Sequence, residues 1–152
     1  MIQRIQTVYL VLLVISLGLA FVFPFSTFPF QDGSLTLGAF GASAEVPNVS
    51  IWFPYYVVLG LSMGIGVITI SQFKNRKKQL QLGKVNYLIT LIALVFIFVD
   101  SDRIADGLGL SETSISYGIG MFSPVVALVF QFLANRGIKA DEKLIKSMDR
   151  LR

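Results

Sequence analysis

The stretch from Lys74 to Lys84, KNRKKQLQLGK, is a strongly charged segment in the middle of an otherwise apolar chain. It contains five cations and no acidic residue, and it lies between an apolar run that ends at Phe73 and another that begins at Val85. A short basic segment between two long apolar runs is typical of two membrane spans joined on the cytoplasmic side. We therefore expect residues 74–84 to form a cytoplasmic loop.

The composition predicts the same class of protein. Of the 152 residues, 54% are hydrophobic and 14% are charged, and the mean hydropathy is +0.71, whereas soluble domains carry about 25% charged residues. The chain has no cysteine and no histidine, which excludes disulfides, thiol redox chemistry and imidazole ligands to metals or haem. Because it also contains no Walker motif or Ser-His arrangement, we expect no enzymatic activity, no cofactor and no metal site.

Four apolar segments are long enough, or nearly long enough, to cross about 30 Å of hydrocarbon as helices. We expect spans at approximately residues 5–23, 53–73, 85–103 and 116–134. The predicted fold is an all-α integral membrane protein, a bundle of four transmembrane helices that forms one domain over residues 1–152. In the third span the apolar core is short, so we expect its helix to continue through Asp100 to Arg103, with an i,i+3 ion pair at a solvated helix end. A hard-cation site at Asp100, Asp102 and Asp106 is the less favoured interpretation.

Lys and Arg are distributed unevenly around these spans. Twelve of the thirteen lie in the N-terminal head, in residues 74–84 or in residues 135–152, and Arg103 is the exception. Six of the nine acidic residues lie on the side of Arg103. The positive-inside rule therefore places both termini in the cytoplasm and makes residues 24–52 an extended first external loop.

The first external loop contains two features of interest. Residues 34–37 and 49–52 alternate between polar and apolar side chains and are flanked by glycines at 33, 38 and 41, which is compatible with a small hairpin lying on the membrane. Phe23, Phe25, Phe28 and Phe30 are expected to anchor the loop at the membrane interface.

Small residues recur at helical spacing in the second and fourth spans. Gly60 with Gly64, and Ser62 with Gly66, form two overlapping small-xxx-small pairs, which allow helix backbones to approach closely. Packing within the chain is the favoured interpretation, and an oligomer contact is the alternative. Gly120 is a further small residue of this kind, in the fourth span. Pro124 should bend the same helix, which would serve close packing or, as the less favoured interpretation, a hinge in a transporter.

Residues 135–152 form the longest polar segment on the cytoplasmic side and contain six cations and three acidic residues. Apolar residues recur there at helical spacing, so we expect an amphipathic helix that lies on the inner leaflet or docks a cytosolic partner. The residues expected to contact anionic lipid headgroups or a protein partner are Lys74, Arg76, Lys77, Lys78, Lys84, Lys139, Lys143, Leu144, Ile145, Met148 and Leu151. Nucleic-acid binding is not expected, because these cations lie against the membrane without a recognised nucleic-acid-binding fold.

Both ends of the chain carry a resemblance. The opening MIQRIQT and the tail pattern LANR..IK.DE.L..S.DRLR resemble a family of small four-span inner-membrane proteins of Bacteroidetes-type bacteria that is a domain of unknown function. The resemblance implies a cytoplasmic-membrane location in a Gram-negative cell. It supplies no activity and transfers no catalytic residue.

The predicted function follows from what the spans lack. Their apolar cores contain no Asp, Glu, Lys, Arg or His, and ionisable residues inside a membrane are the usual mark of ion paths and proton relays. We therefore expect a structural or accessory subunit of a larger membrane complex, with the bilayer and other membrane protein subunits as its partners. An oligomeric small-molecule transporter or channel, or a lipid-binding membrane protein, is the alternative.

Overall fold

The computed structural model describes residues 2–30, 33–44, 51, 53–73, 75–110 and 114–149, and for residues 2–4, 30 and 145–149 it describes the backbone alone. Within this part of the chain, four helices lie alongside one another: α1 (Ile2–Val22), α2 (Tyr55–Ser71), α3 (Arg76–Gly107) and α4 (Ile119–Asp149). α1 packs against α2 and α4, and α3 packs against the same two helices. The expectation of a mostly helical protein is confirmed.

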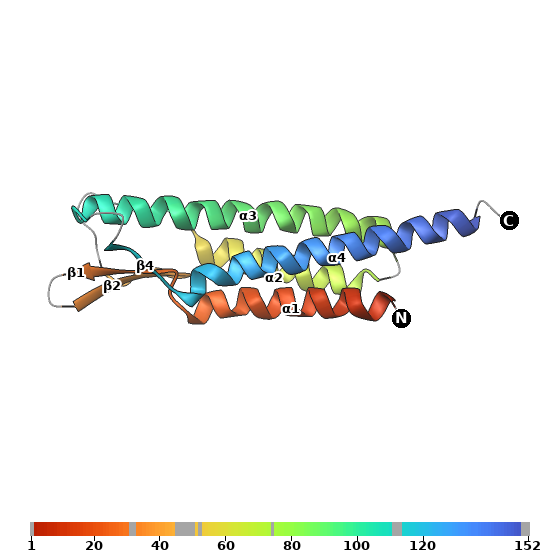
Figure 1. Cartoon of the computed structure of the whole chain (residues 1–152), viewed down its shortest axis with the longest axis horizontal. Coiled ribbons are helices and arrows are strands. Elements are labelled where there is room, and N and C mark those ends of the chain that lie inside the picture. The colour runs from red at the N-terminus through yellow and green to blue at the C-terminus, as the bar shows by residue number, and fades with distance from the viewer. Residues whose placement is uncertain are drawn as a thin grey trace.

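The molecule is elongated, and its two ends differ (Figure 1). α1 and α3 begin, and α4 ends, at one end, which we call the basic end because the exposed Lys77, Lys78, Lys139 and Lys143 lie there. A small antiparallel sheet lies at the opposite end, which we call the sheet end. The strand order is β3-β2-β1-β4, with the bounds β1 (Ser26–Phe30), β2 (Gly33–Gly38), β3 (Gly41–Ala42) and β4 (Ser116–Tyr117).

The predicted all-α fold class omits this sheet, and the predicted hairpin has a different partner strand. The strand expected at residues 34–37 is present as β2, but its partner is β1, with a register that runs from Ser26 opposite Leu37 to Phe30 opposite Gly33. Residues 49, 50 and 52, the second half of the expected hairpin, lie outside the described residues. β4 pairs with the other edge of β1 and so joins the start of α4 to the end of α1.

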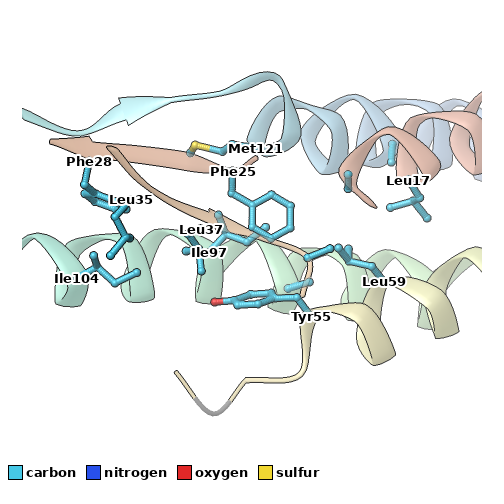
Figure 2. Close-up of a cluster of buried hydrophobic side chains, with 14 of the residues drawn as sticks. Leu17, Phe25, Phe28, Leu35, Leu37, Tyr55, Leu59, Ile97, Ile104 and Met121 are labelled. Carbon is cyan, nitrogen blue, oxygen red and sulfur yellow. The ribbon is translucent and has the colours of Figure 1, made fainter. Parts of the chain in front are cut away.

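The hairpin is held by a core at the sheet end rather than by the membrane interface (Figure 2). Phe25 and Phe28 are fully buried and pack with side chains of β2, α2 and α3, so the prediction that they anchor the loop at an interface is wrong. The ring centroids of Phe25 and Tyr55 are 5.5 Å apart in an edge-on arrangement. Burying such aromatic side chains contributes roughly 1.5–3 kcal/mol each, which fixes the hairpin on α3.

Residues 76–84 are helical, so the prediction that residues 74–84 form a loop is wrong. The side chain of Asn75 accepts a hydrogen bond from the backbone N–H of Lys78 at 3.2 Å and caps the helix that begins at Arg76. α3 then continues for 32 residues, or about 48 Å at 1.5 Å per residue. Residues 76–84 of the basic stretch are therefore the first turns of α3.

α4 combines the predicted fourth span and the predicted tail helix in one continuous helix, preceded by β4 at residues 116–117. Pro124 is buried in its second turn and does not interrupt it. Because proline has no N–H, the carbonyl oxygen of Gly120 would lose its helical partner. The hydroxyl of Ser123 donates to that oxygen at 2.8 Å instead, which is how serine commonly restores a hydrogen bond freed by proline.

Within the part of the chain that the structure describes, three helical segments are long and apolar enough to cross a membrane: Ile5–Val22, Arg76–Gly107 and Ile119–Leu144. α2, which covers most of the predicted second span, is a shorter apolar helix of 17 residues, about 25 Å long.

Candidate functional site

Polar and small side chains occupy most of the buried face of α3, and isoleucines occupy part of it near the sheet end. They alternate at spacings of three and four residues, the pattern that keeps one stripe of a helix against its neighbours. The buried positions at this spacing are Gln79, Gly83, Asn86, Thr90, Ala93, Ile97, Asp100 and Ile104. The opposite face exposes large apolar side chains such as Leu88, Ile92 and Val95. This distribution is the inverse of that on a helix at the surface of a water-soluble protein.

Hydrogen-bonded side chains from three helices meet halfway along this stripe. We call Ser62, Asn86, Thr90, Gln131 and Asn135 the central cluster. The hydroxyl of Ser62 donates to Oδ1 of Asn86 at 2.8 Å and lies 2.7 Å from the Thr90 hydroxyl. Nδ2 of Asn86 donates to Oε1 of Gln131 at 3.0 Å, and Nε2 of Gln131 donates to Oδ1 of Asn135 at 3.1 Å. The cluster thus joins α2, α3 and α4.

Two glycines allow the helices to approach around the central cluster. A Cβ at Gly83 would collide with the side-chain amide of Asn135 and lie 3.0 Å from Nε2 of Gln131, so a larger residue there would displace the two amides that α4 contributes to the central cluster. A Cβ at Gly66 would lie 3.0 Å from Leu13 and 3.1 Å from Val14, where α2 meets α1. Small residues at these positions are what close helix packing requires.

A second polar group lies at the basic end, and we call Gln6, Arg76 and Asp141 the basic-end triad. Nε2 of Gln6 donates to Oδ2 of Asp141 at 2.8 Å, and the guanidinium of Arg76 donates to Oε1 of Gln6 at 3.0 Å. Arg76 also forms an ion pair with Asp141, with 3.4 Å between the nearest N and O atoms. About a tenth of each charged side chain is exposed (11% and 10%), so salt screens this pair less than it screens a surface pair.

The third polar group lies where α2 meets α3 at the sheet end. The hydroxyl of Tyr55 donates to Oδ2 of Asp100 at 2.6 Å and also lies 2.9 Å from the carbonyl oxygen of Phe96. The expected i,i+3 pair of Asp100 with Arg103 is confirmed, at 3.8 Å. Asp100 is only 3% exposed, so the prediction that it lies at a solvated helix end is wrong: Asp100 lies on the buried face of α3, where Tyr55 donates to it.

The interpretation of the aspartates as a hard-cation site finds no geometric basis. Asp102 and Asp106 are exposed while Asp100 turns inward. No group of three or more His, Cys, Asp or Glu side chains that could hold a metal occurs among the described residues.

The predicted packing residues separate into two sets. Ser62 and Gly66 face the interior, and Gly120 packs so closely on the backbone of Phe23 and Pro24 that a Cβ would collide with it. Gly60 and Gly64 instead face outward: a Cβ at Gly64 would meet nothing within 4 Å, and one at Gly60 would only reach Phe21 at 4.0 Å. The two overlapping pairs in α2 therefore lie on opposite faces.

The residues predicted to contact lipid headgroups or a partner also separate. Arg76 is held inside the bundle by the basic-end triad, whereas Lys77, Lys78, Lys84, Lys139, Lys143 and Leu144 are exposed. Lys74 and Leu151 lie outside the described residues, and the side chains of Ile145 and Met148 are not described. The tail does pack beside the basic stretch, through Asp141 and Arg76.

Sequence reasoning missed most of the buried polar groups. The spacing of positions 76, 79, 83, 86 and 90 was the available signal, because polar and small residues at intervals of three and four mark one helix face. Among described side chains, Oε1 of Gln79 is a buried oxygen without a hydrogen-bond partner, while its Nε2 donates to the carbonyl oxygen of Thr69 at 3.1 Å. The polar groups are mainly amides and hydroxyls that satisfy one another, an arrangement suited to holding helices together.

Comparison with known protein families assigns the chain to a family. The profile of a family described as a domain of unknown function, DUF4293, matches residues 2–151. The chain belongs to this family. The match confirms the expected relationship to a domain of unknown function, and it includes nearly all of the opening and the tail on which the resemblance was based. A search of curated proteins found no match. The description of DUF4293 gives no activity, so it assigns no role to the central cluster.

Proposed function

We propose that this DUF4293 protein is an integral protein of a bacterial inner membrane and serves as a structural or accessory subunit of a larger membrane complex. The observation that carries the proposal is the inverted distribution of side chains. Large apolar residues are exposed on all four helices, among them Ile15, Leu61, Leu88 and Phe132, each more than half exposed. The bundle interior holds Asn86 and Gln131, at 0% and 1% exposure. Lipid is the solvent that suits such a surface.

The charges support one orientation in that membrane. The described cations gather toward the basic end, where α1 begins and α4 ends, whereas Arg103 lies on the last turns of α3 near the sheet. The positive-inside rule then places the basic end in the cytoplasm and the sheet outside. α2 is about 25 Å long and so slightly shorter than a typical hydrocarbon core, a mismatch that local thinning and snorkelling lysines accommodate.

Two features favour a supporting role in a complex: the polar atoms inside the bundle bind one another, and one outward strip of α2 has no large side chains. The central cluster uses its polar atoms on one another. On the outside, Gly60 and Gly64 leave a strip of α2 where another helix backbone could approach closely. We infer that this strip is where a membrane partner packs.

Membrane location and orientation are tested by cysteine labelling, for which the natural chain provides a cysteine-free background. Ser34→Cys lies at the exposed start of β2 on the sheet end, and Lys139→Cys lies on the exposed basic end. In intact cells an impermeant maleimide should label the first variant alone, and permeabilised cells should show both. Recovery of the chain in the soluble fraction, or the reverse labelling order, would refute the proposal.

The accessory role is tested by purifying the tagged full chain in mild detergent and quantifying the proteins that accompany it. We expect other membrane subunits in fixed stoichiometry, and their loss in Gly64→Leu. Gly18→Leu is the matched control, because a Cβ at Gly18 on α1 also meets nothing within 4 Å. Recovery of the chain alone would overturn the accessory role.

An oligomeric transporter or channel is the alternative that the same outward glycines favour. In that case the purified chain should be a homo-oligomer that Gly64→Leu dissociates and Gly18→Leu leaves intact. The mass of the purified particle distinguishes this outcome from a complex with other subunits.

A further inference from the structure

A groove of about 300 Å³ lies between α3 and α4 and is lined by Lys84, Tyr87, Leu88, Phe132 and Asn135. Its position along the bundle is informative. Lys84 is the last cation of the basic stretch, and the apolar run of α3 begins at the next residue, Val85. The groove therefore lies where the charged surface of the basic end gives way to the apolar exterior.

The polar part of the groove offers hydrogen-bond donors. Among the described residues, no hydrogen bond or ion pair engages the ammonium group of Lys84 or the hydroxyl of Tyr87. Oδ1 of Asn135 is occupied by Gln131, which leaves Nδ2 as the polar atom of Asn135 available to a ligand. One cation and two neutral groups that can donate suit an anion with several acceptor oxygens, such as a phosphate.

The apolar part of the groove lies on one side of these donors. Leu88 is one helical turn after Lys84 on α3, and Phe132 is about one turn before Asn135 on α4. Because the two helices run in opposite directions (Figure 1), both apolar side chains lie farther from the basic end than the donors do. Leu88 and Phe132 are 57% and 58% exposed, so they offer an apolar surface to a ligand that has an apolar part beside its anionic group.

We propose that this groove binds one anionic glycerophospholipid, with its phosphate against Lys84, Tyr87 and Asn135 and an acyl chain along Leu88 and Phe132. The inference rests on the proposed membrane location and adds a defined ligand to it. Basic pockets between transmembrane helices on the cytoplasmic side are suited to anionic headgroups.

The experiment measures lipid binding to the full chain in mild detergent by native mass spectrometry, with dioleoylphosphatidylglycerol and dioleoylphosphatidylcholine as probes. We expect one tightly bound phosphatidylglycerol per chain and weaker binding of phosphatidylcholine. Lys84→Gln should weaken phosphatidylglycerol binding at least roughly tenfold, the effect of one charged hydrogen bond. Lys77→Gln is the matched control, because Lys77 is exposed on the same helix but does not line the groove, and it should change binding by less than about twofold.

Two further probes keep the result decisive. Tyr87→Phe removes one donor without altering charge and should weaken binding in the same direction as Lys84→Gln, by a smaller factor. Free glycerol 3-phosphate should not displace the lipid, and displacement at comparable concentration would show that the groove takes a soluble phosphate. Equal weakening by Lys77→Gln and Lys84→Gln, or equal affinity for the two lipids, would overturn the site. A chain that stays in the membrane fraction yet binds no lipid refutes this site alone, whereas a soluble chain refutes the proposed function as well.

Discussion

Nε2 of Gln6 lies 2.8 Å from Oδ2 of Asp141, and this hydrogen bond connects residues 135 positions apart in the sequence. It closes α1 onto α4 at the basic end. Arg76 contacts both partners, so one small group of side chains holds the start of α3 to both of those helices.

Asp141→Ala should destabilise the protein, because it leaves the partly buried guanidinium of Arg76 without its carboxylate. We expect a loss of about 1–3 kcal/mol in the free energy of unfolding, measured by unfolding in detergent micelles. Asp102→Ala is the control, since Asp102 is an exposed aspartate on α3, and it should stay within about 0.5 kcal/mol of the wild type. Equal stability of the two variants would show that the basic-end triad contributes nothing.

Asn86 and Gln131 should be energetically coupled. In a double-mutant cycle of Asn86→Ala and Gln131→Ala we expect a coupling energy of roughly 0.5–1.5 kcal/mol, the range found for hydrogen bonds between helices in membranes. A cycle of Asn86→Ala with Asp141→Ala provides the control, because those residues belong to different polar groups. Strictly additive effects for Asn86 and Gln131 would contradict the central cluster as a unit.

Gly83→Ala and Gly64→Ala should have opposite effects on stability. The new Cβ at Gly83 would collide with the amide of Asn135, so that side chain must rotate away and lose its hydrogen bond with Gln131, at a cost of about 1–3 kcal/mol. The new Cβ at Gly64 meets open space, so the higher helix propensity of alanine should stabilise the isolated chain by up to about 1 kcal/mol. Thermal unfolding in one detergent compares them, and a neutral Gly83→Ala would mean that the position of the Asn135 amide is not required for stability.

Tyr55→Phe should destabilise the sheet end, because the buried carboxylate of Asp100 would lose its closest hydrogen-bond donor. The expected loss is about 1–3 kcal/mol. Tyr56→Phe removes the hydroxyl of a neighbouring tyrosine that is half exposed and should change little. If thermal unfolding gives the same midpoint for both variants, Asp100 does not depend on Tyr55.

Local patterns in the sequence were enough to identify the apolar helices and the strand at residues 34–37, because both follow from the spacing of apolar residues. β1 was missed because Phe25 and Phe28 suit a membrane interface as well as a core. Which environment they occupy depends on β2 and α3, which approach them only in the folded chain. The helical start of α3 was missed for a different reason: the high charge of residues 74–84 outweighed the regular spacing of Gln79, Gly83 and Asn86.

The candidate sites were less accessible to sequence reasoning than the fold. The hydrogen-bond partner of the buried Asp100 is Tyr55, which comes from another helix 45 residues earlier. Gly60 and Gly64 could not be distinguished from Ser62 and Gly66 by composition, since only the rotation of α2 in the bundle decides which pair faces inward. Such facts depend on three-dimensional packing, which short-range patterns do not encode.

The pairing of β1 with β4 determines when the sheet can be completed during synthesis of the chain. Ser26 and Thr27 find their partners in Tyr117 and Ser116, and the backbone N–H groups of Gly118 and Gly120 donate to the carbonyl oxygens of Phe25 and Pro24. Residues 116 and 117 must therefore be synthesised before the strand that follows α1 can gain its second neighbour. Until then, one edge of β1 has no partner strand, so the sheet is completed only after α2 and α3 have been synthesised.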